Sequence, residues 1–171
     1  MRAARIYSVI FIPALAQYVV TLEETDGSRL LPIWVGAGEG TFIAAALEGE
    51  KFIRPLTHDL AVSLIGSLGG KIEKVVICDV RDNAYYASIF IKKADRTLEI
   101  DSRPSDAMAL AVRTNSPIFI EEKVLELCPV INKPITGDEV KAFEKEMENL
   151  HPEEFFKKLD EDGGRTESGM E

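Results

Sequence analysis

IDSRPSDAMALAVRTNSPIFI, residues 100–120, contains the junctions that decide the fold. Proline fixes its own φ near the helical value and disfavours the α conformation in the residue before it, so a helix begins beside Pro104. Asn115 tolerates the left-handed conformation in which helices commonly end. The stretch therefore predicts a strand, then a short apolar helix over residues 104–114, then a second strand.

Outward from this stretch, β-branched runs bounded by turn residues alternate with helical patterns. The helical patterns cover about residues 39–48 and 57–68, and the second has an apolar stripe made of Leu60, Ala61, Leu64, Ile65 and Leu68. Strands are expected over residues 3–11, 17–23, 29–36, 71–80, 85–93, 97–101 and 117–120. This order predicts an α+β fold, with a mixed or largely antiparallel sheet and helices packed on it.

The composition changes after Pro134. Residues 1–135 carry 17 acidic and 15 basic side chains, whereas residues 136–171 carry 12 acidic and 5 basic ones. Because the body is nearly neutral, composition neither supports a broad phosphate-binding face nor excludes a local one. The expected organisation is an α+β domain over residues 1–134, an amphipathic helical tail over residues 135–160 and a disordered acidic end over residues 161–171.

The cysteines and the N-terminal residues indicate the cellular compartment of the protein. Cys78 and Cys128 lack a CxxC or Cys/His spacing, which favours a reduced, cytoplasmic protein over a disulfide-bonded one. Residues 1–17, MRAARIYSVIFIPALAQ, imitate a signal peptide, but Pro13 interrupts the apolar run and the following residues continue as a strand. No apolar run of the sequence approaches the roughly 20 residues of a membrane span, so no membrane partner is expected.

Polar residues crowd the start of the helix at Pro104. Asp106 suits the first turn, where a carboxylate can accept hydrogen bonds from free backbone N–H groups. Arg103 and Ser105, beside an exposed helix N-terminus, could instead hold a phosphate. A third interpretation pairs Arg103 with Asp101 or with Asp106 as a surface ion pair. The sequence leaves these alternatives open.

Two further clusters lie at the ends of predicted elements. RPLTHDL, residues 54–60, places Thr57 at a helix N-cap, with His58 and Asp59 in the first turn. The positive end of a helix disfavours a protonated imidazole, so His58 is a candidate general base or metal ligand, although such a histidine is more often a hydrogen-bonded surface residue. Asp79 ends an apolar strand, where an ionised side chain usually needs a partner.

These residue types suit phosphodiester chemistry. The candidate catalytic residues are His58, Asp59, Asp101 and Asp106, the candidate phosphate-binding residues are Arg54, Arg81, Arg103 and Ser105, and the candidate metal ligands are Asp79, Asp101 and Asp106. Oxygen ligands with one imidazole suit Mg²⁺ or Mn²⁺. Metal-bound water could then attack a phosphodiester while arginine neutralises the developing charge. Neither a Rossmann nor a P-loop fingerprint occurs, and no organic cofactor is expected.

Three aromatic residues admit two interpretations. Trp34, Tyr85 and Tyr86 could stack on nucleobases. Their positions in predicted strands favour ordinary packing in the sheet, because aromatic side chains suit a pleated, half-buried surface.

Three segments resemble the bifunctional nuclease domain family. They are LPIWVGAGEGTFIAAALEGEKFIRPLTHDL (31–60), VVICDVRDNAYYASIFI (75–91) and the opening stretch, with RPLTHDL and IDSRPSDAMALA the most specific parts. The resemblance covers about residues 5–127 and assigns no catalytic role to any residue. At the family's motif positions stand His58, Asp59, Asp79, Asp101, Arg103, Ser105 and Asp106. Asn83 and Asn115 stand where glycine is common, so a positive φ is expected at both.

The resemblance implies an α+β domain with nuclease activity on both RNA and DNA, which we take as phosphodiester hydrolysis of low sequence specificity. The alternative is a non-catalytic, oligomeric binding or regulatory module that holds an anionic or phosphorylated ligand at its helix N-termini. The amphipathic tail suits docking on the body or on a second subunit, and a homodimer or other homo-oligomer is expected.

Overall fold

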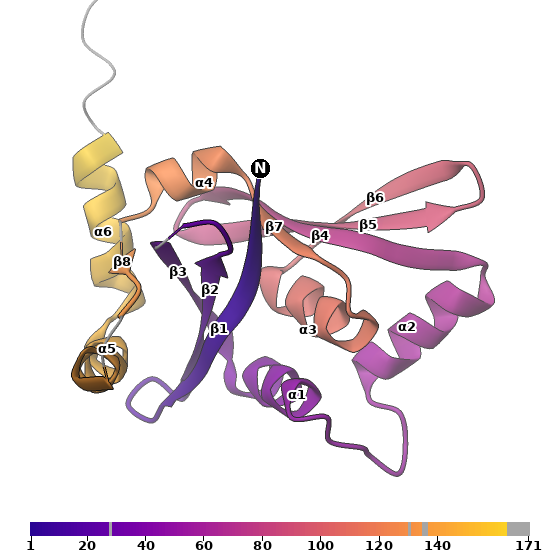
Figure 1. Ribbon diagram of the computed structural model, residues 1–171, viewed down its shortest axis with the longest axis horizontal. Coiled ribbons are helices and arrows are strands. Elements are labelled where there is room, and N and C mark those ends of the chain that lie inside the picture. Colours follow the sequence, from indigo (N-terminus) through magenta and orange to yellow (C-terminus); the bar gives the residue numbers. More distant parts are fainter. Residues whose placement is uncertain (28, 130, 135–136, 164–171) are drawn as a thin grey trace, which may run out of the picture.

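The computed structural model of the chain describes residues 1–27, 29–129, 131–134 and 137–163. Within these residues, eight strands form one sheet and six helices pack around it (Figure 1). The strands are β1 (Arg2–Ile12), β2 (Gln17–Glu24), β3 (Arg29–Gly36), β4 (Gly70–Arg81), β5 (Ala84–Lys93), β6 (Arg96–Ser102), β7 (Ile118–Ile120) and β8 (Ile131–Asn132). The helices are α1 (Ala37–Leu47), α2 (Thr57–Ser67), α3 (Pro104–Thr114), α4 (Glu122–Leu127), α5 (Gly137–Asn149) and α6 (Pro152–Gly163).

The sheet is mixed. Its strand order is β6-β5-β4-β7-β1-β2-β3-β8, and β4 and β7 are its one parallel pair among the described strands. In that pair Val75 lies opposite Ile118, so the short strand that follows α3 enters the middle of the sheet and joins two antiparallel halves. The predicted α+β fold, with helices on a mixed sheet, is confirmed.

Helix α3 lies at the centre of the main core. It spans the predicted residues, and Asn115 after it has a positive φ of 52°, as expected; Asn83 in the β4–β5 turn likewise has a φ of 59°. Residues 107–111 of α3 are all buried, and their alanines let the helix lie close to β4 and β5 while α1 and α2 flank it (Figure 1). Because the middle of α3 is enclosed, its polar side chains reach the surface at its two ends.

The tail covers the other face of the strands β1 to β3. Val20 on β2 joins the core under α1 and α3, whereas the neighbouring Val19 points to the opposite face and packs in a second cluster with Phe143 and Met147 of α5. Phe155 of α6 then packs against Trp34 of β3, with ring centroids 5.3 Å apart. The tail therefore docks on the body of the same chain.

Several boundaries differ from those expected. Helix α1 begins two residues before residue 39, and the N-cap of α2 is Leu56 rather than Thr57. The sequence patterns did not indicate α4 or β8, because elements of six and two residues are too short to show a period. Of the expected acidic end, residues 161–163 belong to α6, and residues 164–171 lie outside the described part of the chain.

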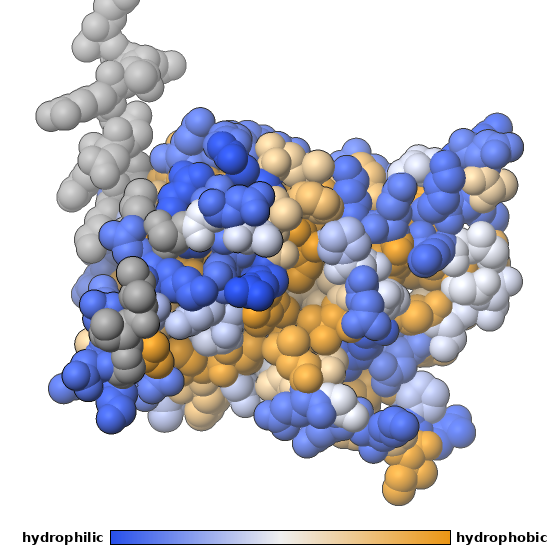
Figure 2. All heavy atoms as spheres, in the orientation of Figure 1, coloured by the Kyte–Doolittle hydropathy of each residue, from blue (hydrophilic) through white to orange (hydrophobic). Residues whose placement is uncertain are grey.

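Helix α2 buries less of its apolar face than its sequence suggests. Ala61 and Ile65 pack against the main core, whereas Leu60, Leu64 and Leu68 are between 52% and 69% exposed. Their spacing places these three leucines along one outer line of the helix. Apolar side chains also reach the surface in the middle of the face that Figure 2 shows. The apolar side chains of α2 thus span a wider part of the helix surface than α3 and β4 cover.

Two features relate to the expected setting of the protein. Cys78 on β4 and Cys128 after α4 are both free thiols, and burial raises the pKa of Cys128 to about 11. Among the helices described here, none combines the length and the apolar character that crossing a membrane requires.

Candidate functional site

Arg103 and Asp106 form an ion pair across the first turn of α3. The guanidinium donates from Nε to Oδ2 of the carboxylate over 2.8 Å and from Nη2 to Oδ1 over 3.1 Å, which is a bidentate arrangement. The side chain of Arg103, the N-cap residue, makes no capping hydrogen bond within the described residues, so it does not satisfy the first-turn N–H groups, which lack intrahelical acceptors. Of the three interpretations of the sequence, the structure contains the Arg103–Asp106 ion pair.

This pairing keeps both groups charged. Burial raises the pKa of Asp106, but hydrogen bonds from Arg103 and His58 and the charge of Arg103 together lower it below its usual value. In turn, the hydrogen bond and the charge of Asp106 raise the pKa of Arg103. At neutral pH the first turn of α3 therefore holds a fixed carboxylate and a fixed guanidinium.

His58, at the start of α2, contacts the carboxylate of Asp106. Its Nε2 lies 3.3 Å from Oδ1 of Asp106, and because an ionised carboxylate can only accept, Nε2 carries the proton. The other ring nitrogen, Nδ1, is buried without a hydrogen-bond partner in the part of the chain that the structure describes. The side chain is only 11% exposed, and the ring meets Phe42 edge-on. In this geometry His58 orients Asp106 and does not face solvent.

Glu39, in the first turn of α1, completes the cluster. Nη1 of Arg103 donates to Oε1 of Glu39 over 3.0 Å, so the guanidinium bridges two carboxylates that come from different helices. These contacts use three of the five N–H donors of Arg103, and the other two have no acceptor among the described residues. Arg103 thus retains donors for an external anion, next to a carboxylate that is 29% exposed.

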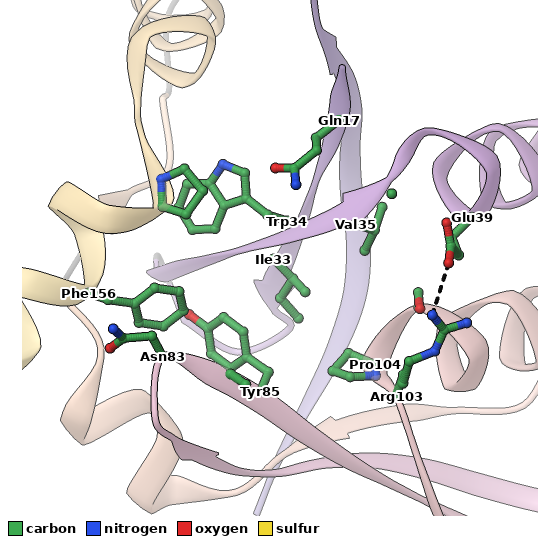
Figure 3. Close-up of a pocket in the computed structure, with 14 residues that line it drawn as sticks. Gln17, Ile33, Trp34, Val35, Glu39, Asn83, Tyr85, Arg103, Pro104 and Phe156 are labelled. Atoms are coloured by element: carbon green, nitrogen blue, oxygen red, sulfur yellow. Dashed lines mark hydrogen bonds and ion pairs between the residues drawn. The ribbon is translucent and has the colours of Figure 1, made fainter. Parts of the chain in front are cut away.

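A pocket of about 370 Å³ opens beside this cluster (Figure 3). Arg103, Ser105 and Glu39 line one end of it, and Trp34 and Tyr85 line the other, together with Phe156 from α6. Burial raises the pKa of Tyr85 well above its usual value, so its hydroxyl stays protonated. Tyr86 lies elsewhere, under the guanidinium of Arg81. Of the three aromatic residues of β3 and β5 considered above, two line the pocket.

The other candidate residues lie outside this pocket. Asp59 accepts from the backbone N of Leu56 and from Nε of Arg113, both over 2.8 Å, and the Leu56 bond is the main cause of its lowered pKa. Asp79 has the partners that its position demanded, Lys123 at 3.2 Å and Arg81 at 3.3 Å. Three candidates lie exposed at separate places: Arg54 on the α1–α2 loop, Arg81 at the end of β4 and Asp101 on β6.

The predicted metal ligands do not gather. Among the described residues, no three His, Cys, Asp or Glu side chains form a group that could hold a metal ion. Asp106 uses both carboxylate oxygens on Arg103, and Asp79 faces two cations. Asp79, Asp101 and Asp106 therefore do not come together as ligands of one Mg²⁺ or Mn²⁺ ion in the described part of the chain.

The comparison with protein families matches residues 20–133 to the bifunctional nuclease domain. The match includes both RPLTHDL and the start of α3, and it covers more than half of the chain. The chain belongs to the bifunctional nuclease domain family. In this chain, the pocket joins residues of the matched domain to Gln17, which precedes the match, and to Pro152 and Phe156 of α6, which follow it.

Relatives of this bifunctional nuclease domain protein occur in bacteria and plants. An uncharacterized protein of Mycobacterium tuberculosis (strain H37Rv) is 35% identical over 148 residues, which cover 81% of this chain and 88% of that protein. Bifunctional nuclease 2 of Oryza sativa subsp. japonica is 33% identical over 112 residues, 63% of this chain and 34% of the relative. Bifunctional nuclease 1 of Arabidopsis thaliana is 29% identical over 107 residues, 60% of this chain and 33% of the relative.

Sequence patterns missed Glu39 as a member of the site. An acid is common in the first turn of a helix for purely local reasons, and the partner of Glu39, Arg103, is 64 residues away. Gln17 and Phe156, which line the pocket, gave no signal either, because only the folded sheet and the docked tail bring them there. An acid in the first turn gave no usable signal, because all six described helices have one there.

Proposed function

We propose that the chain is a nuclease that hydrolyses phosphodiester bonds in RNA and DNA with low sequence specificity, and that the pocket at the start of α3 is its active site. Membership of the bifunctional nuclease domain family supports the reaction class, as do plant relatives that carry the name bifunctional nuclease. The main support for this site is the position of Arg103. Its guanidinium lines the pocket, is held in place by Asp106 and has two N–H donors that bond to no described residue.

Substrate binding exchanges one anion for another on Arg103. The Arg103–Glu39 pair is exposed, with 64% of the arginine side chain open to solvent, and such pairs contribute only about 0–1 kcal/mol. A phosphodiester oxygen can therefore displace Glu39 from Nη1 at little cost. Asp106 holds Nε and Nη2 in place during the exchange, so the guanidinium stays aligned.

The displaced Glu39 carboxylate then acts as general base. It accepts a proton from a water molecule whose oxygen attacks the phosphorus atom, and the bond from phosphorus to the leaving oxygen breaks. The leaving oxygen takes a proton from solvent. Arg103 neutralises the negative charge that grows on the non-bridging oxygens, and the α3 N-terminus favours the same charge.

The first test compares wild type with Asp106→Asn in cleavage of labelled single-stranded RNA and DNA. The substitution removes the charge that aligns Arg103 and places an amide N–H against the N–H donors of Arg103. The cleavage rate is therefore expected to fall about 100-fold. Both proteins are purified in parallel and their melting temperatures are measured. Equal cleavage by two folded proteins would contradict the proposed site, and cleavage by neither would contradict the proposed function.

The same assay tests the expected Mg²⁺ or Mn²⁺ requirement, which stays a prediction. Each reaction is run with Mg²⁺, with Mn²⁺ and with EDTA. Loss of cleavage in EDTA and recovery on adding one of the ions would support a metal that residues outside the set Asp79, Asp101 and Asp106 help to hold. Undiminished cleavage in EDTA would contradict the requirement.

We also propose that the chain forms a homodimer or other homo-oligomer in the cytoplasm. Oligomer formation is supported by the exposed line of leucines on α2, which consists of Leu60, Leu64 and Leu68. An apolar line on one helix can pack against the same line of a second copy across a two-fold axis. The free thiols of Cys78 and Cys128 support the location. Sedimentation equilibrium is expected to give at least twice the chain mass, and Leu64→Glu to reduce it. A monomer mass for wild type at every concentration would contradict the assembly.

A further inference from the structure

The pocket beside Arg103 has two ends of different chemistry. Figure 3 shows Trp34, Tyr85 and Phe156 on one side and Glu39 and Arg103 on the other. The apolar wall between them comes from β3, including Ile33 and Val35. A ligand that fits both ends has a flat apolar part and an anionic part in one small molecule or segment.

Three polar side chains at the aromatic end have no hydrogen-bond partner among the described residues. Neither the side-chain amide of Gln17 nor that of Asn83 bonds to another described residue, and each offers two donors and an acceptor at the pocket lining. The indole Nε1 of Trp34 is buried without a hydrogen-bond partner within the described ranges, although buried indole N–H groups usually have one. The amides of Gln17 and Asn83 thus give the aromatic end a polar edge, which suits a ring that carries donors and acceptors on its own edge.

We propose that this aromatic end binds a nucleobase, so that the chain takes nucleic acid through an unpaired nucleotide. A base stacked at Trp34 and Tyr85 presents its polar edge to the amides of Gln17 and Asn83. The phosphate of the same nucleotide then extends to Arg103, as the proposed nuclease function requires. The volume of about 370 Å³ falls in the range of small-molecule sites, roughly 300–1,000 Å³.

Duplex nucleic acid does not fit this arrangement. A paired base is stacked on both faces and its polar edge is occupied, so it must leave the stack before it can enter a walled pocket. The body of the chain, with 17 acidic and 15 basic side chains over residues 1–135, supplies little general attraction for a duplex backbone. The site thus selects single strands, loops and free nucleotides over paired segments.

Trp34 is the one tryptophan of the chain, so its fluorescence reports on the pocket directly. Wild type is titrated with AMP and UMP, and with ribose 5-phosphate and inorganic phosphate as controls that lack a base. Excitation is at the red edge of the indole band, where the nucleotides do not absorb. We expect saturable quenching by AMP and UMP and none by the two controls. Equal quenching by ribose 5-phosphate, or no change with any probe, would overturn the proposal.

Two variants and two oligonucleotides extend the test. Gln17→Ala removes one amide from the pocket and is expected to weaken AMP binding at least 3-fold, whereas Tyr86→Phe, outside the pocket, leaves it unchanged. A single-stranded oligonucleotide is expected to quench Trp34. The same strand annealed to its full complement as a blunt duplex, which has no unpaired nucleotide, is expected not to quench it. If AMP quenches but the single strand does not, free nucleotides are the ligand and the strand-binding part is overturned.

The outcome separates this proposal from the nuclease function. AMP contains no phosphodiester bond, so its binding can be measured whether or not the chain cleaves nucleic acid. Cleavage without quenching by AMP would overturn the base site and leave the nuclease function standing. Quenching by AMP without cleavage of any strand would overturn the nuclease function, support the base site and favour a nucleotide-binding module.

Discussion

Glu39→Gln is expected to reduce the cleavage rate by about 10²- to 10⁴-fold without weakening nucleotide binding. General bases contribute rate factors of that size. The amide keeps the shape of the carboxylate and an oxygen that can accept from Nη1 of Arg103, but it cannot take a proton from water. Single-turnover cleavage of labelled RNA measures the rate, and quenching of Trp34 by AMP measures binding.

Glu48→Gln is the matched control for this prediction. Glu48 follows the same helix α1 at its C-terminal end, where a negative charge opposes the helix dipole. Neutralising it removes an acid from α1 without touching the pocket, and is expected to leave cleavage unchanged and to raise stability by a few tenths of a kcal/mol. Similar rates for wild type and Glu39→Gln would mean that another group accepts the proton.

Phe155→Ala is expected to lower the free energy of unfolding by about 3–5 kcal/mol, which is the usual cost of deleting a buried phenyl ring. Phe155 is 1% exposed and packs against both Trp34 and Phe156, with centroids 5.3 Å and 5.6 Å away. For a chain of this length, such a loss lowers the melting temperature by roughly 10 °C. Urea unfolding followed by circular dichroism gives the free energy.

Phe11→Ala serves as the comparison for Phe155. Phe11 is 44% exposed and contacts Tyr18, so its removal leaves a much smaller unfilled space. We expect Phe11→Ala to lower the free energy of unfolding much less than Phe155→Ala does, and to leave the emission of Trp34 unchanged. In Phe155→Ala the emission of Trp34 is expected to move to longer wavelength as water reaches the indole. Equal losses for the two variants would show that α6 adds little to the stability of the folded chain.

Local chemistry explains why α3 could be predicted to the residue. Pro104 favours the first helical position and Asn115 accepts a positive φ, so both ends are encoded by residues next to the boundary. The Arg103–Asp106 pair is equally local, since residues three apart share a helix face. The parallel pairing of β4 with β7 has no such local signal, because it depends on where α3 returns the chain to the sheet.

The remaining site contacts are non-local, and sequence patterns could not supply them. The contact of His58 with Asp106 spans 48 residues, and nothing in RPLTHDL specifies which carboxylate its imidazole meets. Asp59 has the same first-turn position as Asp106, yet it contacts Arg113 and the backbone of Leu56. Residue type and position in an element were the same for the two acids, and tertiary packing determined their different partners.

One wall of the pocket belongs to a segment outside the matched domain. Phe156 and Pro152 of α6 line it, so any ligand of the pocket and the docked tail share a surface. Thermodynamic linkage makes the two effects equal. The factor by which docking of α6 raises the affinity of the pocket for a ligand is also the factor by which the bound ligand raises the equilibrium constant for docking of α6. A protease that cuts between α5 and α6 would therefore act as an irreversible antagonist, and an occupied pocket would protect the chain from it.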